Sequence, residues 1–217
     1  MTTPSSARLT PSTCSALSAK ENIRWCTETD ISVADDDELL GLMHDAGCAE
    51  ILIGFESTTF SAVDGIEQRA NWKARKVDSY FNAIRKIQDH GIRVNGCFIF
   101  GLDSTGPESF DDIWQFIQQS GLYDIQITVQ TAFPGTPLYT RLKQEGRILR
   151  DEAWQLCTLF DVNFHPRKMS VPQLEAGLRS LAQQVYEEEV TNARRAAFHR
   201  NYRRKLRQRI VSYANGR

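Results

Sequence analysis

Apolar and polar positions follow two alternating periods along most of the chain. Short apolar runs typical of buried strands lie at 23–29, 50–55, 92–100 and 123–131. Segments with apolar residues at helical spacing, most of them closed by a glycine, lie at 35–47, 77–91, 107–121 and 137–146. Strands that alternate with helices of this length predict parallel pairing through right-handed crossovers. The pattern therefore predicts an α/β sheet or barrel.

The alternation stops near residue 150. Ser170, followed three residues later by Gln173, predicts a capping box at the start of a helix. Apolar residues then recur every three or four positions, at Leu174, Leu178, Leu181, Val185, Phe198, Tyr202, Leu206 and Ile210. This stripe predicts one long helix, or two in tandem, packed against another surface. We therefore expect a disordered leader at 1–21, an α/β part at 22–149 and a helical extension at 150–217.

Composition excludes two broad classes. The chain has 217 residues, of which 41% are hydrophobic and 10% aromatic, enough for a core and too many for wholesale disorder. The sequence contains no run of about 18 apolar residues, so no transmembrane segment is predicted. The Ser-, Thr- and Pro-rich leader lacks the apolar centre of a secretory signal, and a floppy leader is favoured over a transit peptide. An odd number of cysteines without an export signal predicts reduced thiols and a cytoplasmic location.

The net charge of -1 hides a strong asymmetry. Residues 191–217 contain nine Lys or Arg and no acid, which leaves 17 basic and 27 acidic residues elsewhere, a net charge of -10. A basic tail on an acidic body is typical of nucleic-acid or membrane-surface binding, but also of a helix that docks on an acidic neighbour. Aromatic residues at helical spacing within the tail favour docking, so nucleic acid is disfavoured as a partner.

Each predicted strand ends in polar residues. The strand ends are Thr27-Glu28, the run from Gly54 to Ser57, the run from Phe100 to Asp103, and Gln130-Thr131. A turn or an N-cap is enough to explain any one of them alone. The carboxyl ends of parallel strands meet at one edge, where α/β folds carry their sites, so all four together indicate a shared pocket.

Four stretches together resemble radical S-adenosylmethionine enzymes, in particular the group that usually carries an N-terminal cobalamin-binding domain and a helical C-terminal extension. They are "ILIGFES" (51–57), "RVNGCFIFGLDSTGPESF" (93–110), "TAFPGTPLYTRLKQEGRIL" (131–149) and "FHPRKMSVPQL" (164–174). The resemblance covers roughly residues 22–210. It implies a partial (β/α) TIM-type barrel with parallel strands, followed by an α-helical C-terminal extension.

The resemblance also implies a set of cofactor-binding residues. Glu56, with Ser57 beside it, stands where these enzymes contact the ribose and methionyl end of S-adenosylmethionine, and a carboxylate there can accept hydrogen bonds from sugar hydroxyls. Arg75 is a candidate partner for the cofactor carboxylate, with a solvated surface charge as the equal alternative. The remaining candidates are the strand and loop residues Gly96, Phe100, Gly101, Asp103 and Thr131. The two glycines among them, which have no Cβ, let the backbone approach the adenine ring.

One family motif is absent from this sequence. The radical chemistry uses a CxxxCxxC loop whose three thiolates hold a [4Fe-4S] cluster. The five cysteines here are Cys14, Cys26, Cys48, Cys97 and Cys157, no two within four residues of each other, and the histidines also lack metal-ligand spacing, so no metal site is predicted. Catalytic residues remain unassigned. We therefore expect a C-terminal portion of a radical enzyme that is inactive alone, with cobalamin possible only in the full-length family.

Two other hypotheses come from different classes. The first is a non-catalytic partner or scaffold that binds an acidic surface or another subunit through its basic C-terminal helix. The second is an unrelated α/β enzyme with Glu56 or Asp103 as acid or base, which is least favoured because no nucleophile–histidine pair is present. The enzyme hypothesis implies a small-molecule substrate of unknown identity and a missing N-terminal portion or second polypeptide. A partial barrel has two open sheet edges, so either the extension covers one of them or the chain associates.

Overall fold

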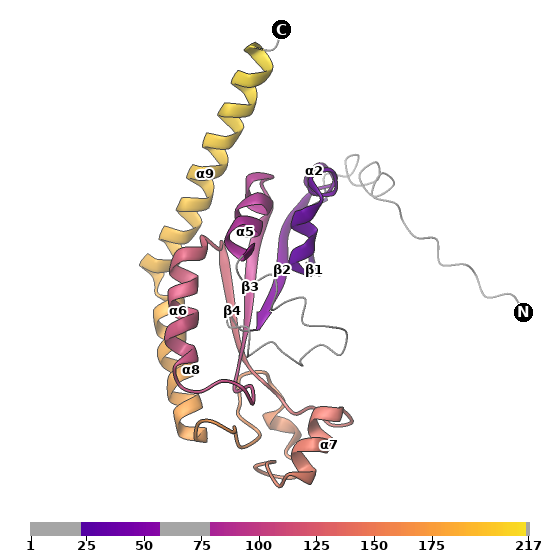
Figure 1. Cartoon of the computed structure of the whole chain (residues 1–217), viewed down its shortest axis with the longest axis vertical. Coiled ribbons are helices and arrows are strands. Elements are labelled where there is room, and N and C mark those ends of the chain that lie inside the picture. The colour runs from indigo at the N-terminus through magenta and orange to yellow at the C-terminus, as the bar shows by residue number, and fades with distance from the viewer. Residues whose placement is uncertain (1–22, 57–78, 216–217) are drawn as a thin grey trace, which may run out of the picture.

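The computed structural model describes residues 23–56 and 79–215, which form one parallel sheet, a set of helices and a long C-terminal helix (Figure 1). The strands are β1 (Trp25–Thr29), β2 (Cys48–Glu56), β3 (Arg93–Phe100) and β4 (Asp124–Val129). They lie in the order β1-β2-β3-β4, and every neighbouring pair is parallel. The predicted parallel α/β arrangement is confirmed.

The helices follow the predicted alternation and then leave it. They are the 3₁₀ helix η1 (Ile31–Asp35), α2 (Asp37–Asp45), α5 (Tyr80–Asp89), α6 (Ser109–Ser120), α7 (Pro137–Gln144), the 3₁₀ helix η3 (Trp154–Leu156), α8 (Val171–Tyr186) and α9 (Glu188–Asn215). The long helical extension is two helices in tandem, because Glu187, with φ -53° and ψ 135°, leaves the helical region. The predicted leader at 1–21 lies outside the described residues.

Local sequence sets several helix ends. Of the three consecutive aspartates at 35–37, Asp35 ends η1, Asp36 is the N-cap of α2, and Asp37 opens the helix. The Asp36 carboxylate accepts a hydrogen bond from the Leu39 amide at 2.9 Å. The capping box expected at Ser170 forms with Gln173, and Gly121 ends α6 in the left-handed region at φ 69°.

Helices cover one face of the sheet. In a sheet whose strands follow chain order, crossovers of one hand place the connecting helices on the same side. The face under α5 and α6 carries the buried side chains Ile51, Ile53, Phe55, Val94, Phe98, Phe100, Ile125, Ile127 and Val129. Phe116 of α6 packs on it, with ring centroids 5.6 Å from Phe55 and 5.8 Å from Phe98.

The opposite face, called the inner face below, is more open. Register places on it Glu50, Leu52, Gly54, Asn95, Cys97, Ile99, Gln126 and Thr128, of which only Thr128 is fully buried. Outer helices around strands with a separate inner face are the arrangement of a (β/α) barrel, of which this sheet is a segment. The predicted fold class, a partial barrel followed by a helical extension, is confirmed.

The C-terminal extension covers the free edge of β4. The Tyr186 hydroxyl at the end of α8 donates to the Ile125 carbonyl at 3.2 Å and accepts from the Ile127 amide at 3.4 Å. The Val129 amide donates to the Leu159 carbonyl at 2.7 Å. These contacts replace the hydrogen bonds of a missing strand. The expectation that the extension covers one sheet edge is thus confirmed.

Helix α9 is only partly packed. Phe198 is 5% exposed and stacks on Tyr202, whose ring packs against the backbone of Gly91. Further along the same helix, Leu206 and Ile210 are 44% and 61% exposed, and Figure 1 shows α9 running beyond the sheet. The predicted apolar stripe therefore docks only in its first part. Across the described residues, no helix has both the length and the apolar character needed to cross a bilayer.

We expect Tyr186→Phe to lower the free energy of unfolding by about 1–2 kcal/mol, because two backbone groups at the edge of β4 lose their partner. Urea denaturation at neutral pH measures this change. Tyr139→Phe is the matched control, since the Tyr139 hydroxyl donates to Asp151 at the surface, and we expect it to change stability little. Equal stability of Tyr186→Phe and the wild type would contradict the proposed role of this hydroxyl.

Candidate functional site

The carboxyl ends of the four strands meet at one edge of the sheet, next to α7 (Figure 1). Glu56 is the last residue of β2 and pairs with Phe98 across a register shift that follows Gly54. The loop after β3 is tied to the segment after β4, because the Gln130 amide donates to the Phe100 carbonyl at 2.8 Å. The strand ends named by the sequence therefore share one edge. Ser57 and Arg75 lie outside the described residues.

Gly96, Phe100 and Gly101 are placed by packing against helices. A Cβ at Gly96 would lie 2.7 Å from the buried Leu122 Cδ1, so this glycine faces the helix-covered side of β3. Phe100 is 1% exposed and stacks on Phe110 with ring centroids 4.7 Å apart. Gly101 has φ +85°, and a Cβ there would lie 3.0 Å from Leu174 of α8. The side-chain positions of these three residues thus point to the core.

Asp103 lies at the centre of an ion-pair cluster, called the Asp103 cluster below. Its carboxylate binds Arg147 Nη2 at 2.7 Å and Arg141 Nη1 at 2.6 Å, with Arg167 Nε at 3.6 Å. Glu145 contacts the same three arginines at 2.9–3.3 Å. The cluster fastens the loop after β3 to α7 and to the extension.

The electrostatics of the cluster favour charged carboxylates. Burial raises the pKa of Asp103, but hydrogen bonds from Arg147 and Arg141 lower it more, and the net pKa is below the ordinary value of 3.8. The hydrogen bond from Arg147 is the main cause that lowers the pKa of Glu145. With its acceptor oxygens used by arginines, Asp103 acts in this structure as a tether for the loop.

Gln130 is a further candidate at the strand ends, in addition to the candidates taken from the sequence. It continues the inner-face alternation of β4, and its Oε1 is buried without a hydrogen-bond partner in the described part of the chain. The candidate beside it, Thr131, is 7% exposed and donates its hydroxyl to the Val129 carbonyl at 3.1 Å. Alternate residues of a strand face the same side, so Gln126 and Thr128 of the inner face predict the same side for Gln130, one residue beyond β4.

The cysteines of the described residues do not converge. Cys26 is exposed, Cys48 is buried, and Cys97 and Cys157 are intermediate. Burial raises the pKa of the Cys48 thiol to about 11, so this residue is a protonated core side chain. Within 23–56 and 79–215, no group of three or more His, Cys, Asp or Glu residues could hold a metal ion.

Comparisons with known proteins find similar sequences and a similar fold. A family described as "Domain of unknown function (DUF4070)" matches residues 136–215. Bacteriochlorophyllide d C-12(1)-methyltransferase of Chlorobaculum tepidum is 26% identical over 168 residues, which are 77% of this chain and 35% of that protein. Hopanoid C-2 methylase of Rhodopseudomonas palustris is 32% identical over 130 residues, which are 60% of this chain and 24% of that protein.

A solved structure shares the fold. The archaeal Elp3 of Methanocaldococcus infernus superposes with a TM-score of 0.53 at 15% sequence identity, over 76% of this chain and 34% of that chain. These matches confirm the resemblance to radical S-adenosylmethionine enzymes, and the chain is homologous to methyltransferases of that superfamily. It spans about a quarter to a third of the length of the two curated relatives described above.

We expect Asp103→Asn to destabilise the protein by about 1–2 kcal/mol at pH 7, because it weakens charge-assisted hydrogen bonds from Arg141 and Arg147. A lowered pKa in the folded state means that the wild-type contribution is complete above 3.8 and is lost as the pH falls through the folded value. The difference between variant and wild type in urea unfolding should therefore shrink below that pH.

The control for this prediction is Asp151→Asn. Lys143 and Tyr139 lower the pKa of Asp151 through hydrogen bonds, but this carboxylate lies at the surface, where solvent screens the interaction. We expect Asp151→Asn to leave stability nearly unchanged at every pH. A pH-independent defect in Asp103→Asn would contradict an electrostatic role of the Asp103 cluster.

Proposed function

We propose that this chain forms the C-terminal part of a radical S-adenosylmethionine methyltransferase, where its strand ends hold S-adenosylmethionine. The observation that carries the proposal is the shared edge formed by Glu56, the loop after β3 and Gln130 in a chain homologous to such methyltransferases. Because the chain corresponds to only a part of its relatives, we propose further that it is inactive by itself.

The residues at this edge fit S-adenosylmethionine. Gln130 Oε1, which is buried and has no partner among the described residues, can accept a hydrogen bond from an amino or hydroxyl group of the cofactor. Glu56, with Ser57, is proposed to bind the ribose hydroxyls, and Arg75 to bind the cofactor carboxylate. Asp103 is proposed to act indirectly, as the anchor of the loop whose backbone at Gly101 borders the site. S-adenosylmethionine supplies the transferable methyl and the source of the radical when bound.

An iron-sulfur cluster does not fit the cysteines of this sequence. The cluster needs three thiolates within one short loop, whereas the five cysteines are widely spaced and the four described ones do not gather. We therefore derive no reaction step through a cluster on this chain. A missing N-terminal portion or a second polypeptide is proposed to supply it, and cobalamin with it in the complete enzyme.

The proposed substrate is a small molecule. The names of the two relatives specify methylation of a bacteriochlorophyllide and of a hopanoid. The inner face is the surface proposed to contact such a molecule, because most of its residues are partly exposed. One of them, Asn95, has an Oδ1 atom that is buried and has no hydrogen-bond partner in the described part of the chain. A cytoplasmic location remains a prediction.

The basic C-terminal helix supports a second candidate function, binding of an acidic surface or another subunit. Arg195 pairs with Asp124 at 2.8 Å and Lys205 with Asp89 at 3.1 Å, so part of the positive charge is used within the chain. Exposed Leu206 and Ile210 lie among the remaining arginines of α9. Salt-sensitive retention on an acidic partner would favour this function over the enzymatic one.

We expect the chain to bind S-adenosylmethionine in equilibrium dialysis, and Glu56→Gln to weaken this binding about tenfold through loss of charge-assisted hydrogen bonds. Gln130→Leu should weaken it as well. Thr191→Val is the control, because its hydroxyl donates to the Val185 carbonyl within the helical extension and belongs to no strand end. Equal affinities of Glu56→Gln, Gln130→Leu and wild type would argue against this edge as the cofactor site.

Anaerobic reconstitution with iron and sulfide tests the second part of the proposal. We expect the purified chain to acquire no stoichiometric four-iron cluster, measured by iron content and visible absorbance, because no three cysteines share a loop. A chain in which all five cysteines are replaced by serine sets the background of non-specific iron. A full cluster on the wild type alone would refute the assignment of the cluster to another polypeptide.

A further inference from the structure

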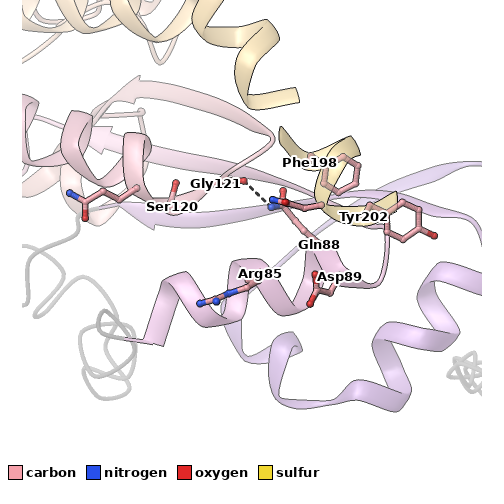
Figure 2. A pocket seen from close by; sticks show the side chains of 9 residues that line it. Arg85, Gln88, Asp89, Ser120, Gly121, Phe198 and Tyr202 are labelled. Atoms are coloured by element: carbon pink, nitrogen blue, oxygen red, sulfur yellow. Dashed lines mark hydrogen bonds between the residues drawn. The ribbon is translucent and has the colours of Figure 1, made fainter. Parts of the chain in front are cut away.

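A pocket of about 330 Å³ lies between the ends of α5 and α6 and the side of α9 (Figure 2). Its volume is in the range of small-molecule sites. A second pocket of about 280 Å³ shares Arg85, Asp89 and Asn201 with it, and we call the two together the helix cleft. The helix cleft adjoins the segments that lead into β3 and β4. It therefore lies near the amino ends of these strands, at the end of the sheet opposite the proposed cofactor site.

Gln88 provides a fixed hydrogen-bond acceptor in this cleft. Its Nε2 donates to the Gly121 carbonyl at 2.8 Å, drawn as the dashed line in Figure 2, and this bond orients the carboxamide. The other end, Oε1, is buried and has no hydrogen-bond partner in the described residues. A buried acceptor without a partner carries a desolvation penalty. A ligand hydroxyl or N–H group at this position would remove it.

The second half of the helix cleft is positively charged. Arg85 of α5 and Arg204 of α9 both line it, and they donate hydrogen bonds to neutral side-chain oxygens, those of Asn82 and Asn201. Among the described residues, the one carboxylate that lines it, Asp89, is neutralised by Lys205 at 3.1 Å. Neither arginine has a carboxylate partner in the described part of the chain. Guanidinium groups from two facing helices suit a phosphate, which accepts several hydrogen bonds at once.

We propose that the helix cleft binds a small phosphate monoester with a hydroxyl-bearing body, of the size of a pentose phosphate or a nucleoside monophosphate. The phosphate lies between Arg85 and Arg204, and a hydroxyl or N–H group donates to Gln88 Oε1. Phe198, which is 5% exposed, supplies the apolar wall for the carbon skeleton. This site is independent of the proposed methyltransferase function, since it shares no residue with the strand ends.

Isothermal titration calorimetry of the full chain tests the proposal with four probes: ribose 5-phosphate, adenosine monophosphate, inorganic phosphate and ribose. We expect at least one of the two esters to bind and inorganic phosphate to bind more weakly. Arg85→Gln and Arg204→Gln should each reduce ester affinity about tenfold, the loss expected for a charge-assisted hydrogen bond. The preferred ester identifies the body of the ligand.

The control is Arg200→Gln, an exposed arginine of α9 that does not line the cleft, and it should retain wild-type affinity. Gln88→Leu should weaken binding of the ester but leave binding of inorganic phosphate unchanged, and urea unfolding checks that this variant is folded.

Three outcomes would overturn the proposal: neither ester binds, Arg200→Gln loses as much affinity as Arg85→Gln, or inorganic phosphate binds as tightly as the esters. Affinity for S-adenosylmethionine should be the same in Arg85→Gln and wild type, which separates this site from the strand ends.

Discussion

The hydrogen bonding along the outer edge of β4 is the constraint on which the rest of this structure depends. An open parallel sheet leaves a row of backbone groups without partners on each outer strand. Here α8 and the segment before it satisfy that row through the Tyr186 hydroxyl, the Leu159 carbonyl and the Asn163 carboxamide, which pairs with both backbone groups of Ala132 at 3.1 Å. The helical extension is therefore a structural part of the sheet, and a partial barrel can form a defined core.

The same extension also shapes the end of the sheet where the carboxyl ends of the strands lie. Leu174 of α8 packs on Gly101, and Arg147 and Arg167 hold Asp103, so the loop after β3 is fixed from two directions. The loop geometry thus depends on residues some 44 and 64 positions away in sequence. Asp103 therefore fixes the backbone of the loop after β3 through ion pairs with distant arginines.

Much of the fold could be predicted from the sequence, because the signals were local. Apolar runs, closing glycines and the Ser170–Gln173 capping box fixed the elements, and strand-helix alternation fixed parallel pairing. The partners of individual residues could not be predicted in the same way. Leu122 leaves no room for a Cβ at Gly96, and Asp103 is held by arginines of distant segments. Neither contact is visible in the sequence next to the residue concerned.

The two outer strands of this sheet, β1 and β4, differ in how their free edges are covered. Residues of the helical extension form hydrogen bonds with the outer edge of β4. In the described residues, the outer edge of β1 is therefore the place where a further strand can pair through its backbone. A strand that paired in parallel beside Trp25–Thr29 would have its carboxyl end at the same end of the sheet as the four described strands.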